Sequence, residues 1–118
     1  MKQMLQTSFA VGLLIVAVYT FSTTATAETV IVKYRGPVEL SHFDCQYVSR
    51  SSVVKRLCYD SHERYVVVNL TGTYYHYCEV PPTTVTAWKQ APSMGTFYNS
   101  EIKGRFDCRN SQVPAYDK

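Results

Sequence analysis

Four cysteines limit the folds open to this 118-residue chain more than any other residues do: Cys45, Cys58, Cys78 and Cys108. A domain of this size buries little apolar surface, and disulfide bonds commonly supply the missing stability in small exported domains. Because the count is even, we predict two disulfide bonds, each contributing about 2–4 kcal/mol. Successive cysteines are 13, 20 and 30 residues apart. Zinc sites usually contain cysteine pairs only about two to four residues apart, so the spacing argues against a metal site.

The first 27 residues are organised like a secretory signal peptide. Lys2 precedes an apolar run of 13 residues, 9–21, and a small polar stretch ends at Ala25-x-Ala27. The run is shorter than the roughly 20 residues that a membrane-spanning helix needs. We therefore predict cleavage after Ala27, export to the periplasm or the extracellular space, and no membrane anchor after cleavage. Export agrees with the predicted disulfides, because disulfides persist in oxidising compartments.

The composition is that of a folded domain with a mild positive charge. Hydrophobic residues make up 46% and charged residues 18%, which excludes disorder throughout the chain. Twelve Lys and Arg against nine Asp and Glu give a net charge of +3. That charge is well short of the charge of a dedicated nucleic-acid-binding tail.

Three consecutive segments have the composition of β-strands. Residues 53–59, 64–70 and 73–80 are rich in β-branched and aromatic side chains, and short polar turns separate them. Thr71-Gly72 predicts a tight reversal between the last two. Strands joined by such short connections pair antiparallel, so we predict a three-stranded meander.

Two short helices are predicted after these strands. Pro81-Pro82 ends the third strand and favours a first helical turn, because proline lacks the N–H that would have no acceptor there. Ser93 can cap a second helix and Gly104 can end it. The apolar stripe of this second helix comprises Met94, Phe97, Tyr98 and Ile102.

The predicted fold class is therefore α+β: a small three-stranded antiparallel meander followed by two short helices packed on one face (β-β-β-α-α). Residues 28–50 are predicted to form an N-terminal extension, residues 51–108 the domain, and residues 109–118 a loose C-terminal tail.

Strand order excludes one disulfide pairing. In a meander the first and third strands are separated by the middle one, which places them about 9.6 Å apart at ~4.8 Å per strand. A disulfide needs Cα atoms within roughly 7 Å, so Cys58 and Cys78 are not expected to bond to each other. Cys45 and Cys108 then each bond to one of these strand cysteines. The two pairings that satisfy this condition both remain open.

Several short motifs follow one another in the second half of the chain: Ser51-Ser52, Tyr59-Asp60, Tyr75-His76-Tyr77, Val80-Pro81-Pro82, Gly95-x-Phe97-Tyr98-Asn99 and Ile102-Lys103-Gly104-Arg105-Phe106. Their order resembles the KTSC domain, over about residues 51–107. This family is named for a module at the C-terminus of some lysyl-tRNA synthetases, and a Tyr-x-Tyr motif is its hallmark. The resemblance implies a small stand-alone module, and the synthetase context implies RNA binding.

The Tyr-x-Tyr motif allows two interpretations. Side chains alternate along a strand, so Tyr75 and Tyr77 share one face while Tyr74 and His76 share the other. Tyr75 and Tyr77 could form a stacking platform for bases or sugars. They could instead pack under the helices, where a small sheet needs large residues to fill the core. We favour packing, which leaves the face of Tyr74 and His76 to solvent.

A basic cluster near the end of the second helix is a further binding candidate. Lys103, Arg105 and Arg109, joined by Lys55 and Arg56, could hold a phosphate, a carboxylate or an acidic glycan. The alternative is a solvated helix end, where cations interact favourably with the helix dipole. The binding candidates are Tyr75, His76, Tyr77, Asn99, Lys103 and Arg105.

No catalytic group is predicted. The three histidines, His42, His62 and His76, have no nucleophile or paired carboxylate in a recognisable pattern around them.

We predict an exported, non-enzymatic binding module with no cofactor or metal, acting through its sheet face or its basic helix end on an unidentified ligand or protein partner. The alternative is an RNA- or single-stranded nucleic-acid-binding domain, which requires exposed aromatic residues beside the basic cluster. Asn69-Leu70-Thr71 also matches a glycosylation acceptor.

Overall fold

The computed structural model describes residues 12, 14–20 and 27–116. Most of the predicted signal peptide and the last two residues of the predicted tail lie outside the described residues. In the part of the chain that is described, none of the helices is long and apolar enough to cross a membrane.

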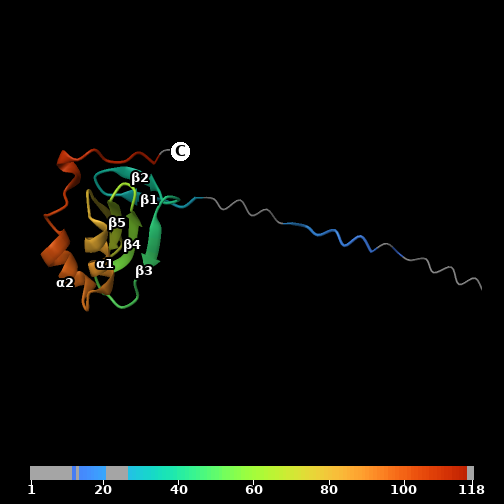
Figure 1. The fold of residues 1–118 in the computed structure, drawn as a ribbon, viewed down its shortest axis with the longest axis horizontal. Coiled ribbons are helices and arrows are strands. Elements are labelled where there is room, and N and C mark those ends of the chain that lie inside the picture. The colour runs from blue at the N-terminus through green and yellow to red at the C-terminus, as the bar shows by residue number, and fades with distance from the viewer. Residues whose placement is uncertain (1–11, 13, 21–26, 117–118) are drawn as a thin grey trace, which may run out of the picture.

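Six strands form one mixed sheet that curves into a half-barrel (Figure 1). The strand order across the sheet is β2-β1-β6-β5-β4-β3. All neighbours pair antiparallel except β1 and β6, which pair in parallel through Val32 and Tyr74. The strands are β1 (Thr29–Val32), β2 (Gly36–Glu39), β3 (Asp44–Tyr47), β4 (Val54–Asp60), β5 (Tyr65–Leu70) and β6 (Thr73–Tyr77).

The predicted three-stranded meander with two helices is wrong as a description of the fold, because the sheet has six strands. The three additional strands lie in residues 28–50, which were predicted to be an extension. Each has only four residues, and β2 contains Gly36-Pro37, a pair typical of a chain reversal. Such short strands are stabilised by pairing with distant parts of the chain, so their own sequence carries a weak signal.

The hairpin between β5 and β6 shows why the central strands form where they do. Thr71 and Gly72 both have positive φ angles, 52° and 106°, as a two-residue hairpin turn of this kind requires. Leu70 and Thr73 then lie opposite each other and start the ladder.

The helices cover one face of the sheet (Figure 1). Helix α1 spans Pro82–Gln90, and α2 spans Met94–Phe97 and continues as a wider π-helical turn over Tyr98–Ile102. The Ser93 hydroxyl caps α2 by accepting a hydrogen bond from the Thr96 amide at 3.1 Å. The core under the helices is centred on Trp88, with Leu57 and Val66 of the sheet fully buried against it.

The opposite face is covered as well, which the sequence did not predict. Val32 and Val38 of the β1–β2 hairpin are buried there together with Tyr65 and Val67 of β5. The prediction that this face meets solvent is therefore wrong. β1 pairs with β6 and extends the sheet past it. The β1–β2 hairpin thereby reaches this second face and packs its valines there.

The C-terminal segment, predicted to be loose, packs against this second core. Cys108–Asn110 form a 3₁₀ turn, and Tyr116 is buried with only 9% of its surface exposed. Its hydroxyl donates to the buried carboxylate of Asp60 at 2.6 Å. A buried carboxylate needs such donors, so this bond holds the segment on the domain.

The two disulfides are Cys45–Cys58 and Cys78–Cys108, and the excluded Cys58–Cys78 bond is absent. Cys45 and Cys58 face each other across the β3–β4 ladder, with Cα atoms 4.0 Å apart. Cys78, just after β6, bonds to Cys108 in the 3₁₀ turn.

Candidate binding groove at the edge of β6

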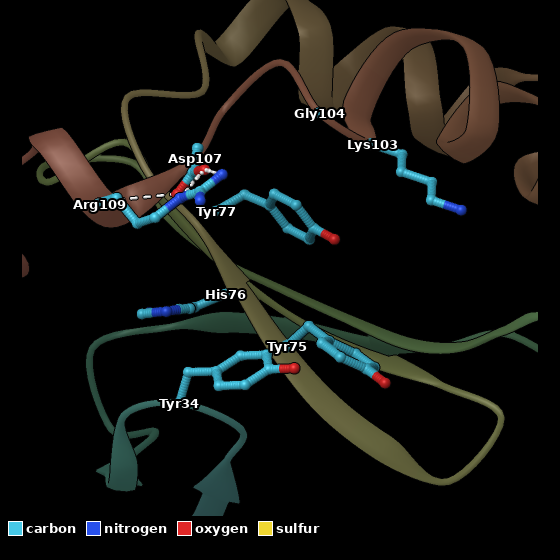
Figure 2. Close-up of a pocket in the computed structure, with 8 residues that line it drawn as sticks. All are labelled: Tyr34, Tyr75, His76, Tyr77, Lys103, Gly104, Asp107 and Arg109. Atoms are coloured by element: carbon cyan, nitrogen blue, oxygen red, sulfur yellow. Dashed lines mark hydrogen bonds and ion pairs between the residues drawn. The ribbon is translucent and has the colours of Figure 1, made fainter.

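A groove of about 650 Å³ with an aromatic lining lies beside β6, and we call it the β6-edge groove (Figure 2). It joins parts of the chain that are far apart in sequence: the β1–β2 turn, β6, and the segment after α2. Its lining residues are Tyr34, Tyr75, His76, Tyr77, Lys103, Gly104, Asp107 and Arg109.

Tyr75 and Tyr77 take part in both the core and the groove. Both are half-buried and pack against the core under the helices. The Tyr77 hydroxyl is hydrogen-bonded to the Tyr98 hydroxyl, and burial raises the pKa of Tyr77. Each ring also lines the groove, so packing against the core and exposure to the groove are combined in the same side chains.

The His76 ring points to the other face of the sheet, where it meets a buried partner. Its Nδ1 atom is hydrogen-bonded to the Tyr65 hydroxyl at 2.7 Å. Burial lowers the pKa of His76, and the nearby Arg35 lowers it further. Burial also raises the pKa of Tyr65 to about 12. This pair stays neutral at physiological pH and contributes mainly to the fold.

The backbone of His76 occupies an open position beside β6, past the point where β1 stops pairing with it. On the side of β6 away from β5, the Tyr74 carbonyl accepts a hydrogen bond from the Lys33 amide at 2.8 Å. Further along, the Cys78 amide donates to the Phe106 carbonyl at 2.9 Å. Backbone groups of alternate residues point to the same side of a strand, so the amide and carbonyl of His76 face outward between these bonds. Among residues 27–116, no backbone group bonds to them.

Cationic side chains surround the aromatic rings of the groove. The Lys33 ammonium lies 5.3 Å from the centre of the Tyr34 ring and 5.7 Å from that of Tyr75. Lys103 is exposed, and neither it nor Lys33 forms an ion pair with any residue that the structure describes. Arg109 is paired with Asp107, which lowers the pKa of this carboxyl, so these two charges largely cancel.

Comparison with known proteins identifies the family. The family model of the KTSC domain matches residues 50–106. The crystal structure of a KTSC domain protein from Yersinia pestis is similar, with 30% sequence identity and a TM-score of 0.52. The similarity covers 55% of this chain and 92% of that protein. This chain belongs to the KTSC domain family. No curated protein matches the chain significantly.

The KTSC region supplies only part of the groove. Tyr75, Tyr77 and Lys103 lie within the matched residues, whereas Tyr34 and Arg109 lie in the segments before and after them. Each disulfide also bonds one cysteine of the KTSC region to one cysteine of a flanking segment. The flanking segments are therefore cross-linked to the KTSC domain and complete its groove.

The remaining predicted site residues lie elsewhere. Asn99 lines a separate pocket of about 310 Å³ together with Ser51 and Ser52. Arg105 is exposed and lies 3.9 Å from Glu101. Arg56 is buried and pairs with Glu28, so the predicted basic cluster does not form as one patch.

Tyr34 and Asp107 were missed as groove residues. Tyr34 belongs to a segment that was taken for an extension, and only the β1–β6 pairing brings it to the groove. Val30 and Val32 before residues 33–36, and Val38 and Leu40 after them, alternate with other residues and indicate a hairpin that would have placed Tyr34 at its turn. Asp107 caps the 3₁₀ turn by accepting from the Arg109 amide at 2.8 Å, and Asp before a short helical turn is a recognisable signal.

The lowered pKa of His76 predicts how stability depends on pH. An imidazole in the unfolded chain has a pKa of about 6.5, and the folded value is lower. Below about pH 6.5 the unfolded state binds more protons, so stability is lost as the pH falls toward the folded pKa. The lowered carboxyl pKa values of Glu28 and Asp107 affect stability only at more acidic pH. We expect a loss of stability between about pH 7 and pH 5, and a smaller loss in His76→Gln, as measured by urea unfolding. An equal loss in both proteins would contradict this.

Proposed function

We propose that this KTSC protein is an exported, non-enzymatic binding module that holds an anionic ligand in the β6-edge groove. The observation that carries the proposal is the outward-facing amide and carbonyl of His76, a residue that lines the groove together with three tyrosines and Lys103. Backbone groups at an open sheet edge bind polar ligands directionally, tyrosine rings add stacking area, and lysines attract negative charge.

The groups in the groove support binding rather than catalysis. The His76 ring is bonded to Tyr65 on the other face, and Asp107 is held by Arg109. General acid–base catalysis needs a titratable group that can reach the substrate proton. The exposed groove residues, Tyr34 and Lys103, are instead suited to contact and charge pairing.

Single-stranded nucleic acid is the second candidate ligand. Tyr34 is 85% exposed, and Lys33 lies over its ring. An exposed tyrosine beside a lysine can stack on a base while the ammonium pairs with a phosphate. The sequence prediction required exposed aromatic residues beside the basic cluster at the end of the second helix, whereas the lysine next to Tyr34 is Lys33 of the β1–β2 turn.

Two features support export. The chain contains two disulfides, which persist in oxidising compartments. Glu28, the first residue after the predicted cleavage site, binds Arg56 through both carboxylate oxygens, at 2.6 and 2.8 Å. Cleavage after Ala27 keeps this pair. The intact mass of the exported protein is expected to correspond to residues 28–118, and a mass that retains residues 1–27 would contradict the proposal.

The binding function can be tested by titrating ¹⁵N-labelled protein with three probes: an acidic pentapeptide, a hexamer of deoxythymidine and a trimer of galacturonate. We expect at least one probe to shift the amide signals of Tyr34, His76 and Gly104. Tyr34→Ala is expected to weaken the binding of that probe about tenfold, since an aromatic contact contributes roughly 1–3 kcal/mol. Tyr47→Ala is the matched control, because Tyr47 is 76% exposed but lies on β3 at the opposite edge of the sheet. Shifts confined to other surfaces, or none with any probe, would overturn the proposal.

A further inference from the structure

We infer that the ligand of the β6-edge groove is an extended peptide with an acidic side chain, bound as an added strand next to β6. This inference rests on the proposed binding function and names its ligand class. It starts from the backbone of β6, because only hydrogen-bonding groups with the spacing of a strand distinguish a peptide from other anions.

The open position has the size and polarity of a single step of a β-ladder. It is bounded by the bond from Lys33 to Tyr74 and by the bond from Cys78 to Phe106. Between them, His76 offers one donor and one acceptor on the same side. A peptide residue that pairs with His76 supplies the complementary acceptor and donor from its own backbone. A polyanion such as a nucleic acid has phosphate acceptors for the amide but no regularly spaced backbone donor for the carbonyl.

The course of β1 explains why this position is open. β1 runs parallel to β6 as far as Val32, and the ladder would reach His76 if the chain continued straight. At Tyr34 the backbone adopts a φ of 70° and turns into β2. The turn takes β1 away from β6 and sets Tyr34 beside the gap (Figure 2). An added strand can therefore take the place that β1 leaves.

Side chains around the gap provide specificity for such a peptide. Alternate side chains of an added strand would point to opposite faces of the sheet. On the face of the helices they would meet the rings of Tyr75 and Tyr77 and the ammonium of Lys103. Lys103 has no ion-pair partner among residues 27–116, so an acidic side chain is the complementary one. Tyr34 would cover the peptide at the end where β1 turns away.

The test uses the acetylated and amidated pentapeptide Thr-Val-Glu-Val-Thr and five derivatives, each N-methylated at one residue. N-methylation removes a donor and blocks pairing on that side. We expect the parent peptide to shift the His76 amide signal. We expect N-methylation at one residue, the one whose amide donates to the His76 carbonyl, to weaken binding about tenfold, and N-methylation at the other four residues to leave the dissociation constant unchanged. Sensitivity at a single backbone amide is specific to a strand that pairs with the one open residue of β6.

The pairing of Lys103 with an acidic side chain of the peptide is tested by exchanging the two charges. The Lys103→Glu variant is expected to bind the Glu-containing peptide at least tenfold more weakly than the parent protein does. Binding by this variant is expected to recover when the Glu of the peptide is replaced by Lys. Binding that no single N-methylation weakens would overturn strand addition while leaving the binding function intact. Shifts in the groove by the deoxythymidine hexamer or galacturonate trimer, with none by the peptide, would do the same. If none of the probes shifts the groove signals, the inference and the proposed function both fail.

Discussion

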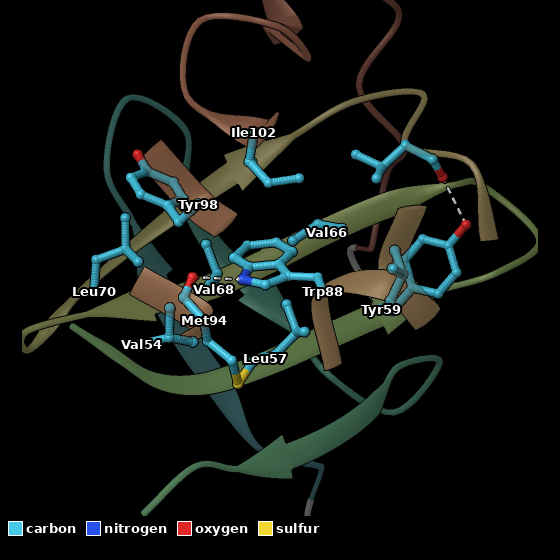
Figure 3. Packing of buried hydrophobic residues seen from close by; sticks show 12 residues of the cluster. Val54, Leu57, Tyr59, Val66, Val68, Leu70, Trp88, Met94, Tyr98 and Ile102 are labelled. Carbon is cyan, nitrogen blue, oxygen red and sulfur yellow. Dashed lines mark hydrogen bonds between the residues drawn. The ribbon is translucent and has the colours of Figure 1, made fainter. Parts of the chain in front are cut away.

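Replacing Trp88 with alanine is expected to lower the free energy of unfolding by about 3–5 kcal/mol, a large part of the ~5–10 kcal/mol that stabilises a domain of this size. Trp88 is fully buried, and its ring stacks with those of Phe97 and Tyr98, with centroids 6.3 and 6.1 Å apart. Figure 3 shows Trp88 in the middle of the buried cluster, with Tyr98 and Leu57 beside it. Its Nε1 donates to the Met94 carbonyl at 3.1 Å. Alanine would leave a cavity between the helices and the sheet, and would remove this hydrogen bond.

Thermal and urea unfolding with both disulfides intact would measure the effect. Ile31→Ala is the control, because Ile31 is also a large apolar residue but is 67% exposed on β1. It is expected to change stability by no more than about 0.5 kcal/mol. Equal effects of the two substitutions would show that the core is not centred on Trp88.

Joint replacement of Cys78 and Cys108 with serine is expected to lower the free energy of unfolding by roughly 3–4 kcal/mol. The bond closes a loop with a sequence separation of 30, and the entropy that such a loop removes from the unfolded chain corresponds to about this value. The bond also anchors the segment that leads to Tyr116, whose buried side chain covers the second core.

The other disulfide provides the comparison. Cys45 and Cys58 are separated by 13 residues, so the same entropic relation predicts a loss about 0.7 kcal/mol smaller when both become serine. Urea unfolding of the two double variants would measure the difference. A larger loss from the Cys45 and Cys58 replacement would mean that β3 contributes more to the domain than the C-terminal segment does.

Strand addition at β6 would give the flanking segments a function beyond stability. The turn that carries Tyr34 and the segment that carries Asp107 both lie outside the region matched by the KTSC family. They border the groove on two sides, and the Cys78–Cys108 disulfide holds the second of these segments in place next to Asp107. Reduction of this disulfide is therefore expected to affect the groove as well as the fold.

Local signals were sufficient for the central part of the domain. The predicted strands at residues 53–59, 64–70 and 73–80 correspond closely to β4, β5 and β6, because their β-branched runs are bounded by turns. Ser93 caps α2 as expected, and Gly104 ends the helical segment with a φ of 79°. These features depend on residues within a few positions of one another, so the sequence contains them directly.

Short elements that depend on distant partners could not be predicted in this way. β1, β2 and β3 have four residues each, and their stability comes from pairing across the sheet. The burial of Tyr116 depends on Asp60, 56 positions away. Strand order excluded Cys58–Cys78, but the choice between the two other pairings needed the register that sets Cys45 opposite Cys58.

The same distinction between local and long-range signals applies to the candidate site. The sequence was enough to select Tyr75, Tyr77 and Lys103, because they lie on a predicted strand and at the end of a predicted helix. Only the tertiary structure revealed the open backbone of His76, which exists because β1 leaves β6 at the turn of Tyr34. An open sheet edge is defined by the strand that does not continue beside it. That absence is a property of how the whole chain packs, and no residue of β6 encodes it.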